Sequence, residues 1–227
     1  MDAGRREARQ GAKEGTVIIA GEQTEGKGRL QRTWFSPSGN IALSIILYPD
    51  IASLPYLIMI ASLAVAYSIE DVTGLKTQIK WPNDILIGGK KVGGILIENE
   101  VKRNKVAFTI IGIGINVDLR VSEFTDITTA ATSLNRESEK VVRRTKIIRS
   151  LLTEFERLYL SLPAGEPIYK TWRERLATLG RRVKVKSGSV TLEGIAESVD
   201  GSGALMLRQA DGSLTRVITG DVTLRED

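Results

Sequence analysis

The sequence predicts an α+β fold, in which helices pack on a mixed β-sheet and a small SH3-like β-barrel follows at the C-terminus. Two long segments, residues 54–73 and 143–162, carry apolar residues at helical spacing. Short β-branched runs lie before and between them, and closely spaced alternating strands follow Leu179. A chain of 227 residues can bury one medium core and one small core. We therefore expect a first domain at residues 1–178 and the barrel at residues 179–227.

The N-terminal region is predicted to form a helix, a strand and a long loop. Residues 2–13 are polar and Arg-rich with alanines at helical spacing, so an exposed helix is expected. The β-branched run at residues 16–20 predicts a buried strand. Residues 21–39 lack hydrophobic periodicity and are rich in Gly, Arg, Ser and Pro. Long loops of this kind in compact domains usually bind ligands or act as lids.

The centre of the chain is predicted to combine strands with one apolar helix. Residues 41–48 predict a strand, and residues 54–73 predict a helix that is closed by Gly74. Two turn segments, Gly88-Gly89 and the polar residues 102–105, connect further strands. These further strands are expected at residues 77–80, 85–87, 92–98 and 106–117.

The C-terminal third changes from helices to short strands. Helices are expected at residues 143–162 and 168–176. Turn residues such as Ser187-Gly188 and Asp211-Gly212 then separate short alternating runs, which suits a small barrel. The barrel strands are expected at residues 183–185, 190–199, 204–207 and 214–219.

The composition excludes several kinds of catalytic chemistry. The chain contains no cysteine, which excludes disulfides, thiolate nucleophiles and cysteine metal sites. It contains no histidine either, which excludes Ser-His-Asp catalysis and histidine zinc sites. Acid–base work must therefore come from Lys, Asp, Glu or Tyr, or the chemistry must rest on electrostatics and positioning. The net charge of +5 favours anionic ligands such as nucleotides or acidic proteins.

The hydropathy pattern predicts a protein that is neither secreted nor embedded in a membrane. The most apolar stretch, residues 54–66, is interrupted by Pro55, Tyr56 and Ser62 and suits a buried helix better than a membrane span. The N-terminus is polar and has no secretory signal pattern. We expect a cytoplasmic location.

A glycine-rich basic loop is the first candidate functional motif. Gly26 and Gly28 let the backbone approach a ligand and present N–H groups to an anion. Lys27, Arg29 and Arg32 add cations that can grip phosphate. The alternative is a solvated basic loop that binds nothing.

The second motif is Lys80-Trp81-Pro82-Asn83-Asp84, followed by a strand that begins near Lys91. Asn83 and Asp84 offer hard oxygens that suit Mg²⁺ or can orient an amine. Lys91 can neutralise charge on a carboxylate or an α-phosphate, and Gly93-Gly94 leaves room for a ligand against the sheet. The alternative is a hairpin with ordinary surface lysines.

The third motif is an apolar strand with alternate glycines, Ile111-Gly112-Ile113-Gly114-Ile115-Asn116-Val117. Glycines at every second position remove the side chains from one face of a strand, which weakens the strand unless something fills the space. A flat ligand on that face is the functional interpretation. Close packing of a helix is the alternative.

In order and content, these three segments closely resemble the biotin–protein ligase (biotin–acetyl-CoA-carboxylase ligase) family, over nearly the whole chain. The resemblance implies a class II synthetase-like catalytic domain with a small C-terminal barrel. It implies that ATP and biotin, with Mg²⁺, give biotinyl-5′-AMP, and that a lysine of a biotin carboxyl carrier protein then accepts the biotin. It also implies the monofunctional type without a DNA-binding domain, hence no nucleic-acid partner, and by analogy a homodimer.

The resemblance also implies roles for individual residues. Lys91, Arg29 and Asp84 are expected to be catalytic, with Lys91 at the carboxylate–phosphate junction and Asp84 orienting the incoming lysine or a metal. Asn83 and Asp84 are the implied metal ligands. The residues expected to bind biotin or nucleotide are Gln23, Gly26, Lys27, Gly28, Arg29, Arg32, Trp34, Lys91, Gly94, Ile95, Gly112, Gly114 and Asn116.

Three departures from the family pattern are expected to matter. Lys27 replaces an arginine of the family's loop and keeps its charge, whereas Gln31 replaces a glycine, which would change how the loop closes. Relatives carry a strand ending in Ser-Thr before the helix that begins here at Met1-Asp2, so either the start codon is assigned too late or the biotin pocket is depleted.

Two other functions compete with biotin ligation. One is a lipoate or octanoyl ligase of related fold, against which the Lys-Trp-Pro-Asn-Asp segment and the basic loop argue. The other is a nucleic-acid-binding module. The predicted barrel argues against it, because residues 177–227 contain no Phe, Tyr or Trp on which bases could stack.

Overall fold

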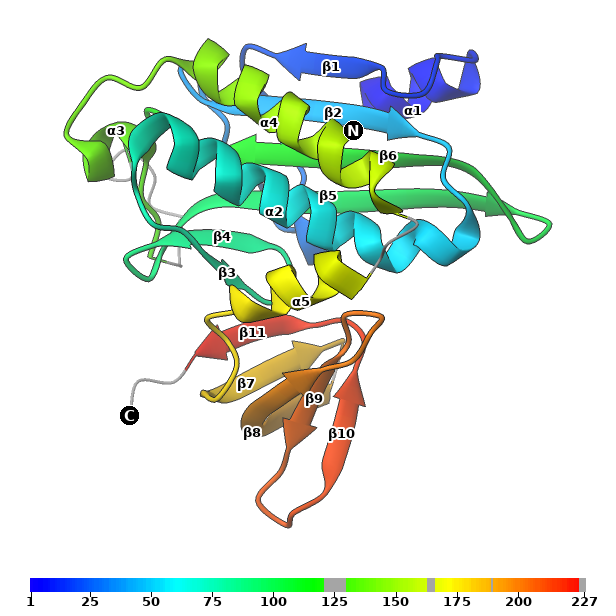
Figure 1. The fold of residues 1–227 in the computed structure, drawn as a ribbon, viewed down its shortest axis with the longest axis vertical. Coiled ribbons are helices and arrows are strands. Elements are labelled where there is room, and N and C mark those ends of the chain that lie inside the picture. The colour runs from blue at the N-terminus through cyan, green and yellow to red at the C-terminus, as the bar shows by residue number, and fades with distance from the viewer. Residues whose placement is uncertain (121–129, 163–165, 189, 225–227) are drawn as a thin grey trace.

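The computed structural model describes residues 1–120, 130–162, 166–188 and 190–224, and only the main chain of Gln31 and Glu166. The described residues form a six-stranded sheet and a five-stranded sheet (Figure 1). The first contains β1 (Val17–Ala20), β2 (Ile41–Leu47), β3 (Gln78–Lys80), β4 (Asp84–Ile87), β5 (Lys90–Lys102) and β6 (Lys105–Ile115). The second contains β7 (Arg182–Ser187), β8 (Val190–Val199), β9 (Leu205–Arg208), β10 (Leu214–Val217) and β11 (Asp221–Leu224). The helices are α1 (Asp2–Arg9), η1 (Arg29–Gln31), η2 (Ile51–Ser53), α2 (Leu54–Thr73), α3 (Leu134–Ser138), α4 (Arg144–Leu160) and α5 (Glu166–Glu174).

The larger sheet has the strand order β1-β2-β6-β5-β4-β3, and its neighbouring strands pair antiparallel. Its mixed character comes from two isolated parallel bridges, Ile79 with Leu176 and Lys91 with Ala131. The smaller sheet has the order β10-β9-β8-β7-β11 and lies beneath α5 in Figure 1. The predicted α+β architecture is confirmed.

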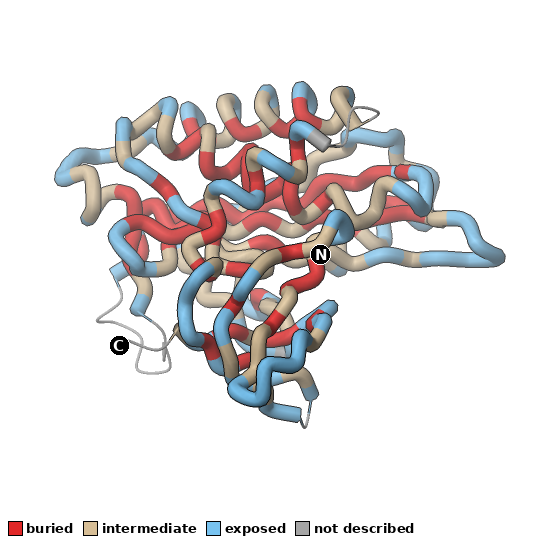
Figure 2. Tube along the Cα trace, turned by 60° about the horizontal axis from the view of Figure 1, so that its bottom comes forward, coloured by how far each residue is buried: buried red, intermediate tan, exposed pale blue. Residues whose placement is uncertain are grey.

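Helices α2 and α4 cover one face of the larger sheet, and the core lies between these helices and the sheet (Figures 1 and 2). Successive side chains of a strand point to opposite faces, so Leu43, Ile95 and Ile113 face these helices together. Helix α2 ends as predicted, because Gly74 takes a left-handed conformation with φ of 73°.

Helix α2 contains the apolar stretch that was expected to be a buried helix rather than a membrane span. The continuous helical segment Ile51–Thr73 is long and apolar enough by length and composition. In the structure the middle of α2 is buried, with Leu57, Ile60 and Leu63 fully inaccessible in the core. A long core helix can match a membrane span in length and composition. Burial against the sheet therefore accounts for the apolar residues of α2.

Helix α1 covers only one end of the opposite face. Gly4 lets the helix approach closely, because a Cβ there would lie 3.1 Å from Ile110 Cγ2. Ala8 is buried against Ile46 and Ile110. The exposed helix predicted over residues 2–13 is therefore shorter than expected, and α1 packs on the sheet through two buried small residues, Gly4 and Ala8.

Three other local predictions are corrected by the structure. The strand at residues 16–20 was expected to be buried, but β1 is the outer strand of the sheet and Ile19 is 54% exposed. Helix α3 was not predicted, because five residues are too short to show a helical period. The run at residues 214–219 is not the last strand, since the chain turns at Gly220 and β11 follows.

Tryptophan 81 joins the two sheets. Its indole N–H donates to the carbonyl of Gly203, at 2.8 Å, and its main-chain N–H donates to Thr178 Oγ1, at 2.9 Å. Trp81 is buried, so both hydrogen bonds are shielded from water. The division of the chain near Leu179 stays a prediction.

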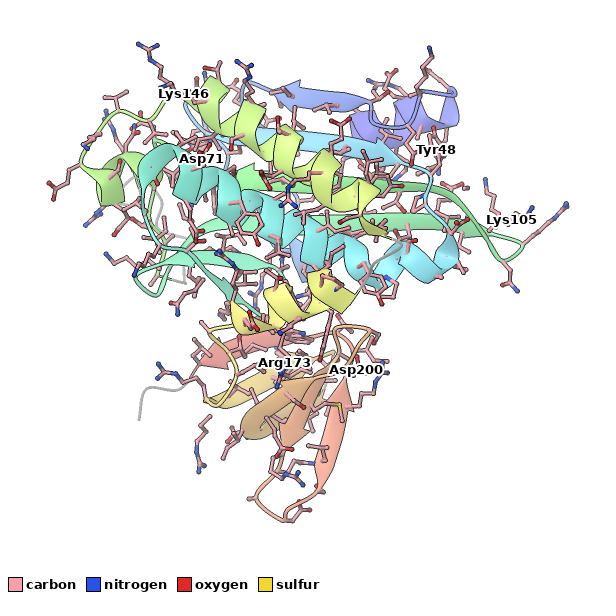
Figure 3. All side chains as sticks on the ribbon, in the orientation of Figure 1. Tyr48, Asp71, Lys105, Lys146, Arg173 and Asp200 are labelled. Carbon is pink, nitrogen blue, oxygen red and sulfur yellow. The ribbon has the colours of Figure 1, made fainter. Side chains whose placement is uncertain are left out.

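We predict that Asp200→Ala lowers the free energy of unfolding by about 1–2 kcal/mol. Asp200, labelled in Figure 3, lies in the turn between β8 and β9. Its Oδ1 accepts hydrogen bonds from the main-chain N–H groups of Ser202, at 2.9 Å, and Ala204, at 3.0 Å. Its Oδ2 accepts from Arg216 Nε, at 2.6 Å. Replacing the carboxylate leaves these donors without their acceptor, and a thermal melt measures the loss.

The pH dependence of this contribution follows from the ionisation of Asp200. Burial opposes ionisation, but hydrogen bonds from Ser202, Arg216 and two main-chain N–H groups outweigh it and lower the pKa of Asp200 from 3.8 to about 2. The contribution is therefore complete above pH 3.8 and is lost as the pH falls towards 2. Asp211→Ala is the matched control, because Asp211 makes a similar turn with an exposed side chain. Equal effects of the two variants would contradict the prediction.

Candidate functional site

The glycine-rich loop folds back on itself as an irregular hairpin. An isolated bridge pairs Gln23 with Ser36, and the Trp34 N–H donates to the carbonyl of Gly26, at 2.8 Å. A Cβ at Gly26 would lie 2.2 Å from the Trp34 carbonyl oxygen, so only glycine allows this approach. Leu30 turns the tip with φ of 53°, a left-handed conformation that is uncommon for leucine. The loop is therefore held in shape by its own main chain.

A β-bulge in strand β5 sets the direction of Lys91. The pairing of β4 with β5 shifts between Ile85 and Leu86, which leaves Val92 as an extra residue of β5. In a regular strand Lys91 and Gly94 would point to opposite faces. The bulge brings them to the same face, where a Cβ at Gly94 would lie 3.4 Å from Lys91 Cε.

The ammonium group of Lys91 is fixed by two neighbours. Its Nζ lies 2.6 Å from Asp84 Oδ1, and the side chains of Lys91 and Asp84 are 24% and 17% exposed. The same nitrogen lies 5.5 Å from the centre of the Trp34 ring, within cation–π range. An ordinary surface lysine would keep its rotamers free, so the alternative of a hairpin with solvated lysines does not describe Lys91.

Small residues form a flat floor on the face of the sheet that α1 leaves open. The register places Gly94, Gly114 and Ala42 side by side on three strands. A Cβ at Gly114 would lie 2.4 Å from Trp34 Cε2, so the indole rests directly on the glycine. At Gly112 the neighbour is the Met1 side chain, whose sulfur would be 2.4 Å from a Cβ. A flat aromatic group thus covers the floor at Gly114, where the alternative was a packed helix.

Arg29 reaches from the loop into the site and is half-buried. Its Nη1 donates to Asn83 Oδ1, at 3.2 Å, and to the Gly220 carbonyl, at 3.1 Å. Its Nη2 donates to Thr219 Oγ1, at 2.9 Å. Burial lowers the pKa of Arg29, against the opposing charges of Asp84 and Asp221. All three acceptors are neutral, so they orient the guanidinium without cancelling its charge.

The other two basic residues of the loop lie at the rim. Lys27 Nζ donates to Asp2 Oδ2, at 2.7 Å, and this hydrogen bond raises the pKa of Lys27. Arg32 is paired with Asp221 of β11, and its side chain is 56% exposed. Exposed ion pairs contribute little to stability, so both cations are available to an anionic ligand.

Asn116 and Ile95 support the site from behind. The Asn116 side-chain amide is buried and donates to the Thr132 carbonyl, at 3.1 Å, and the Asn116 carbonyl accepts from Leu134 N, at 2.9 Å. The Thr132 N–H donates to the Lys91 carbonyl, at 2.9 Å. Asn116 therefore fixes the segment after residue 129 beside β5. The Ile95 side chain belongs to the core, so this residue meets the site through its main chain.

These residues surround one cavity of about 770 Å³. Every residue predicted to be catalytic or ligand-binding lines it except Gly26, whose role is the close approach inside the loop. Gly93, expected with Gly94 to leave room for a ligand, does not line it either, because a Cβ there would face Ile85 of the core.

Sequence reasoning missed Ser44 and Asp221, which also line the cavity. The signal at Ser44 is a lone hydroxyl in an otherwise apolar strand. No local pattern marks Asp221, because its partner Arg32 lies near the other end of the chain.

Asn83 and Asp84 do not by themselves form a metal site. Asn83 Oδ1 accepts from Arg29, and Asp84 is paired with Lys91. Within the described part of the chain no group of three or more acidic side chains is placed to hold a metal ion. A magnesium ion here would need most of its ligands from a bound phosphate and from water.

Comparisons with known proteins identify the family. Residues 5–116 match the model of the biotin/lipoate A/B protein ligase family, and residues 178–225 match the biotin protein ligase C-terminal domain. The bifunctional ligase/repressor BirA of Bacillus spizizenii is 38% identical, over 96% of this chain and 68% of that protein. This chain belongs to the biotin/lipoate A/B protein ligase family. The family predicted from the motifs is confirmed.

Two further relatives of the biotin/lipoate ligase family match most of their own length. The biotin--[acetyl-CoA-carboxylase] ligase of Paracoccus denitrificans is 33% identical, over 86% of this chain and 85% of that protein. The structure of the Aquifex aeolicus biotin protein ligase in complex with biotin and ATP superimposes with a TM-score of 0.80 at 27% identity. That match covers 98% of this chain and 94% of the other.

Proposed function

We propose that this chain activates biotin with ATP to biotinyl-5′-AMP and transfers the biotinyl group to a lysine of a biotin carboxyl carrier protein. The observation that carries the proposal is the Lys91–Asp84 ion pair over the Gly94–Gly114 floor, with Arg29 aimed at the same cavity. The related ligases described above support biotin as the acid that is activated.

The first step needs an anion to attack another anion. A carboxylate oxygen of biotin attacks the α-phosphorus of ATP, and pyrophosphate leaves. The Lys91 ammonium lies where it can neutralise both the carboxylate and the α-phosphate, which lowers the repulsion between them. Arg29 has no ion-pair partner among the described residues, so its positive charge can bind the phosphates. Arg32 and Lys27 at the rim can bind the pyrophosphate as it leaves. This chemistry needs no histidine or cysteine, in agreement with the composition.

The second step transfers the biotinyl group from the adenylate to an amine. The carrier's lysine attacks the carbonyl carbon of the mixed anhydride, and AMP leaves with the bonding electrons of the broken C–O bond. Lys91 can stabilise the developing oxyanion from its fixed position. Asp84 has a second carboxylate oxygen, and we assign to it the orientation of the incoming amine. The floor and Trp34 hold the acyl group and exclude water from the anhydride.

The remaining assignments are also proposals. Magnesium would arrive with ATP and neutralise charge on its phosphates, rather than occupy a resident site at Asn83 and Asp84. The carrier domain is the proposed protein partner, and a nucleic-acid partner is not expected. A homodimer and a cytoplasmic location stay predictions, and sedimentation at micromolar concentration tests the first of them.

The function is tested by incubating the protein with biotin, Mg-ATP and a purified carrier domain and measuring the mass of the carrier. We expect one biotinyl group on each carrier and no addition when ATP is omitted. Parallel reactions with lipoate and octanoate separate the lipoate-ligase alternative, which the family description includes. Acylation by lipoate in preference to biotin would overturn the proposal, and so would the absence of any acylation.

A further inference from the structure

The turn between β10 and β11 of the C-terminal barrel touches the glycine-rich loop. We call Thr219, Gly220 and Asp221 the barrel turn. Arg29 donates to the Gly220 carbonyl, at 3.1 Å, and to Thr219 Oγ1, at 2.9 Å. Arg32 pairs with Asp221. Two loop arginines thus meet three consecutive barrel residues that lie about 190 positions further along the chain.

The barrel turn is held rigidly by the barrel itself. Gly220 is buried, and a Cβ there would lie 2.7 Å from Val185 Cγ1 and 3.2 Å from the Lys186 carbonyl oxygen. The next residues are paired with β7, and Val222 is buried in the core. The acceptors that Arg29 meets are therefore presented by a packed element and not by a second free loop. Groups on packed elements hold a partner in place more accurately than groups on loops do.

The barrel turn makes different kinds of contact with the two arginines. Thr219 and Gly220 offer Arg29 neutral oxygens, and none of the ion pairs found among the described residues includes Arg29. Its charge is left for a ligand, while its direction is fixed. Asp221 instead neutralises the exposed Arg32, so a phosphate group at Arg32 must compete with a carboxylate.

We infer that the barrel turn positions the loop arginines for the nucleotide: Thr219 and Gly220 orient Arg29 towards the phosphates, and Asp221 restrains Arg32 until a phosphate replaces it. This inference rests on the proposed function, because it takes ATP as the ligand. It makes Thr219 a positioning residue for a reaction whose other groups lie on the larger sheet and its loop. The barrel then contributes to ATP binding without contacting the acid that is activated.

The inference is tested with two variants of the barrel turn that should act in opposite directions. Thr219→Val keeps the shape of the side chain but removes the acceptor, and we expect the KM for ATP to rise about tenfold. Thr219→Ser retains the hydroxyl and should restore the wild-type value. Asp221→Asn removes the competing charge, and we expect the KM for ATP to fall about two- to threefold at low salt. The dissociation constant for biotin should not change in any of them.

Thr191→Val is the matched control, because Thr191 is an exposed threonine on β8 of the same barrel. If the substitutions merely loosened the barrel, the KM for ATP would rise in both Thr219→Val and Asp221→Asn. Positioning instead predicts that the KM for ATP rises in the first variant and falls in the second. The inference is overturned if Thr219→Val matches Thr191→Val, or if both turn variants raise the KM for ATP.

A second measurement keeps this inference separate from the proposed function. Trypsin cleaves after arginine, so cutting after Arg29 and Arg32 reports on whether the barrel turn holds the loop. We expect Thr219→Val to be cut about tenfold faster there than wild type and Thr191→Val to be cut at the wild-type rate. Faster cleavage in a protein that biotinylates no carrier would support the contact and refute the function. Unchanged cleavage in an active ligase would refute the contact alone.

Discussion

Lys91→Ala is expected to lower the rate of biotinyl-5′-AMP formation by about 100- to 1000-fold. The ammonium group is held 2.6 Å from Asp84 and lies over Gly94, where the carboxylate and the α-phosphate would meet. Alanine removes the charge that offsets their repulsion and leaves Asp84, a further negative charge, in its place. Single-turnover release of pyrophosphate, with the adenylate identified by mass, measures the effect.

Lys90→Ala is the matched control for this prediction. Lys90 is the preceding residue, but its side chain is 47% exposed and pairs with Glu137 away from the floor. We expect it to form the adenylate at the wild-type rate. Thermal melts of both variants show whether the proteins are folded. Adenylate formation that survives in folded Lys91→Ala protein would remove Lys91 from the mechanism.

Gly114→Ala is expected to weaken biotin binding while the sheet remains folded. The new Cβ would lie 2.4 Å from the Trp34 indole, so the indole must leave the floor and the cavity loses its flat surface. Overpacking of this kind costs about 1–3 kcal/mol, which is about 5- to 150-fold in a dissociation constant. Titration calorimetry with biotin measures the change. Tryptophan fluorescence follows Trp34, because Trp81 and Trp172 are buried.

Gly21→Ala is the control for Gly114→Ala. A Cβ at Gly21 would meet nothing within 4 Å, and its backbone does not require a left-handed conformation. Biotin affinity equal in the two variants would contradict the prediction. The double variant Trp34→Ala with Gly114→Ala adds a second check. If the indole causes the clash, adding Gly114→Ala to Trp34→Ala should cost less than it does in the wild type.

The sequence predicted local geometry around the cavity wherever a residue's type limits its conformation. Alternate glycines at Gly112 and Gly114 required a face without side chains, and the structure provides that face. The helix ended by Gly74 was predicted with the correct bounds, because a left-handed glycine ends a helix wherever it occurs.

What sequence reasoning missed depends on contacts between distant segments. Nothing near Asp221 shows that its carboxylate will meet Arg32 from the other end of the chain. The exposure of β1 was missed because a β-branched run has the same sequence pattern in a central strand as in an edge strand. Local patterns specify the faces of an element, whereas the neighbours of that element are set by the whole fold.

The bulge at Val92 makes the chemistry of the site depend on a count of residues. If every residue were retained but β5 paired in regular alternation, Lys91 and Gly94 would lie on opposite faces of the strand. Lys91 would then point into the apolar core that α2 and α4 cover, where an ammonium group would have only hydrocarbon around it. The position of this positive charge is thus specified by one extra residue in a single strand.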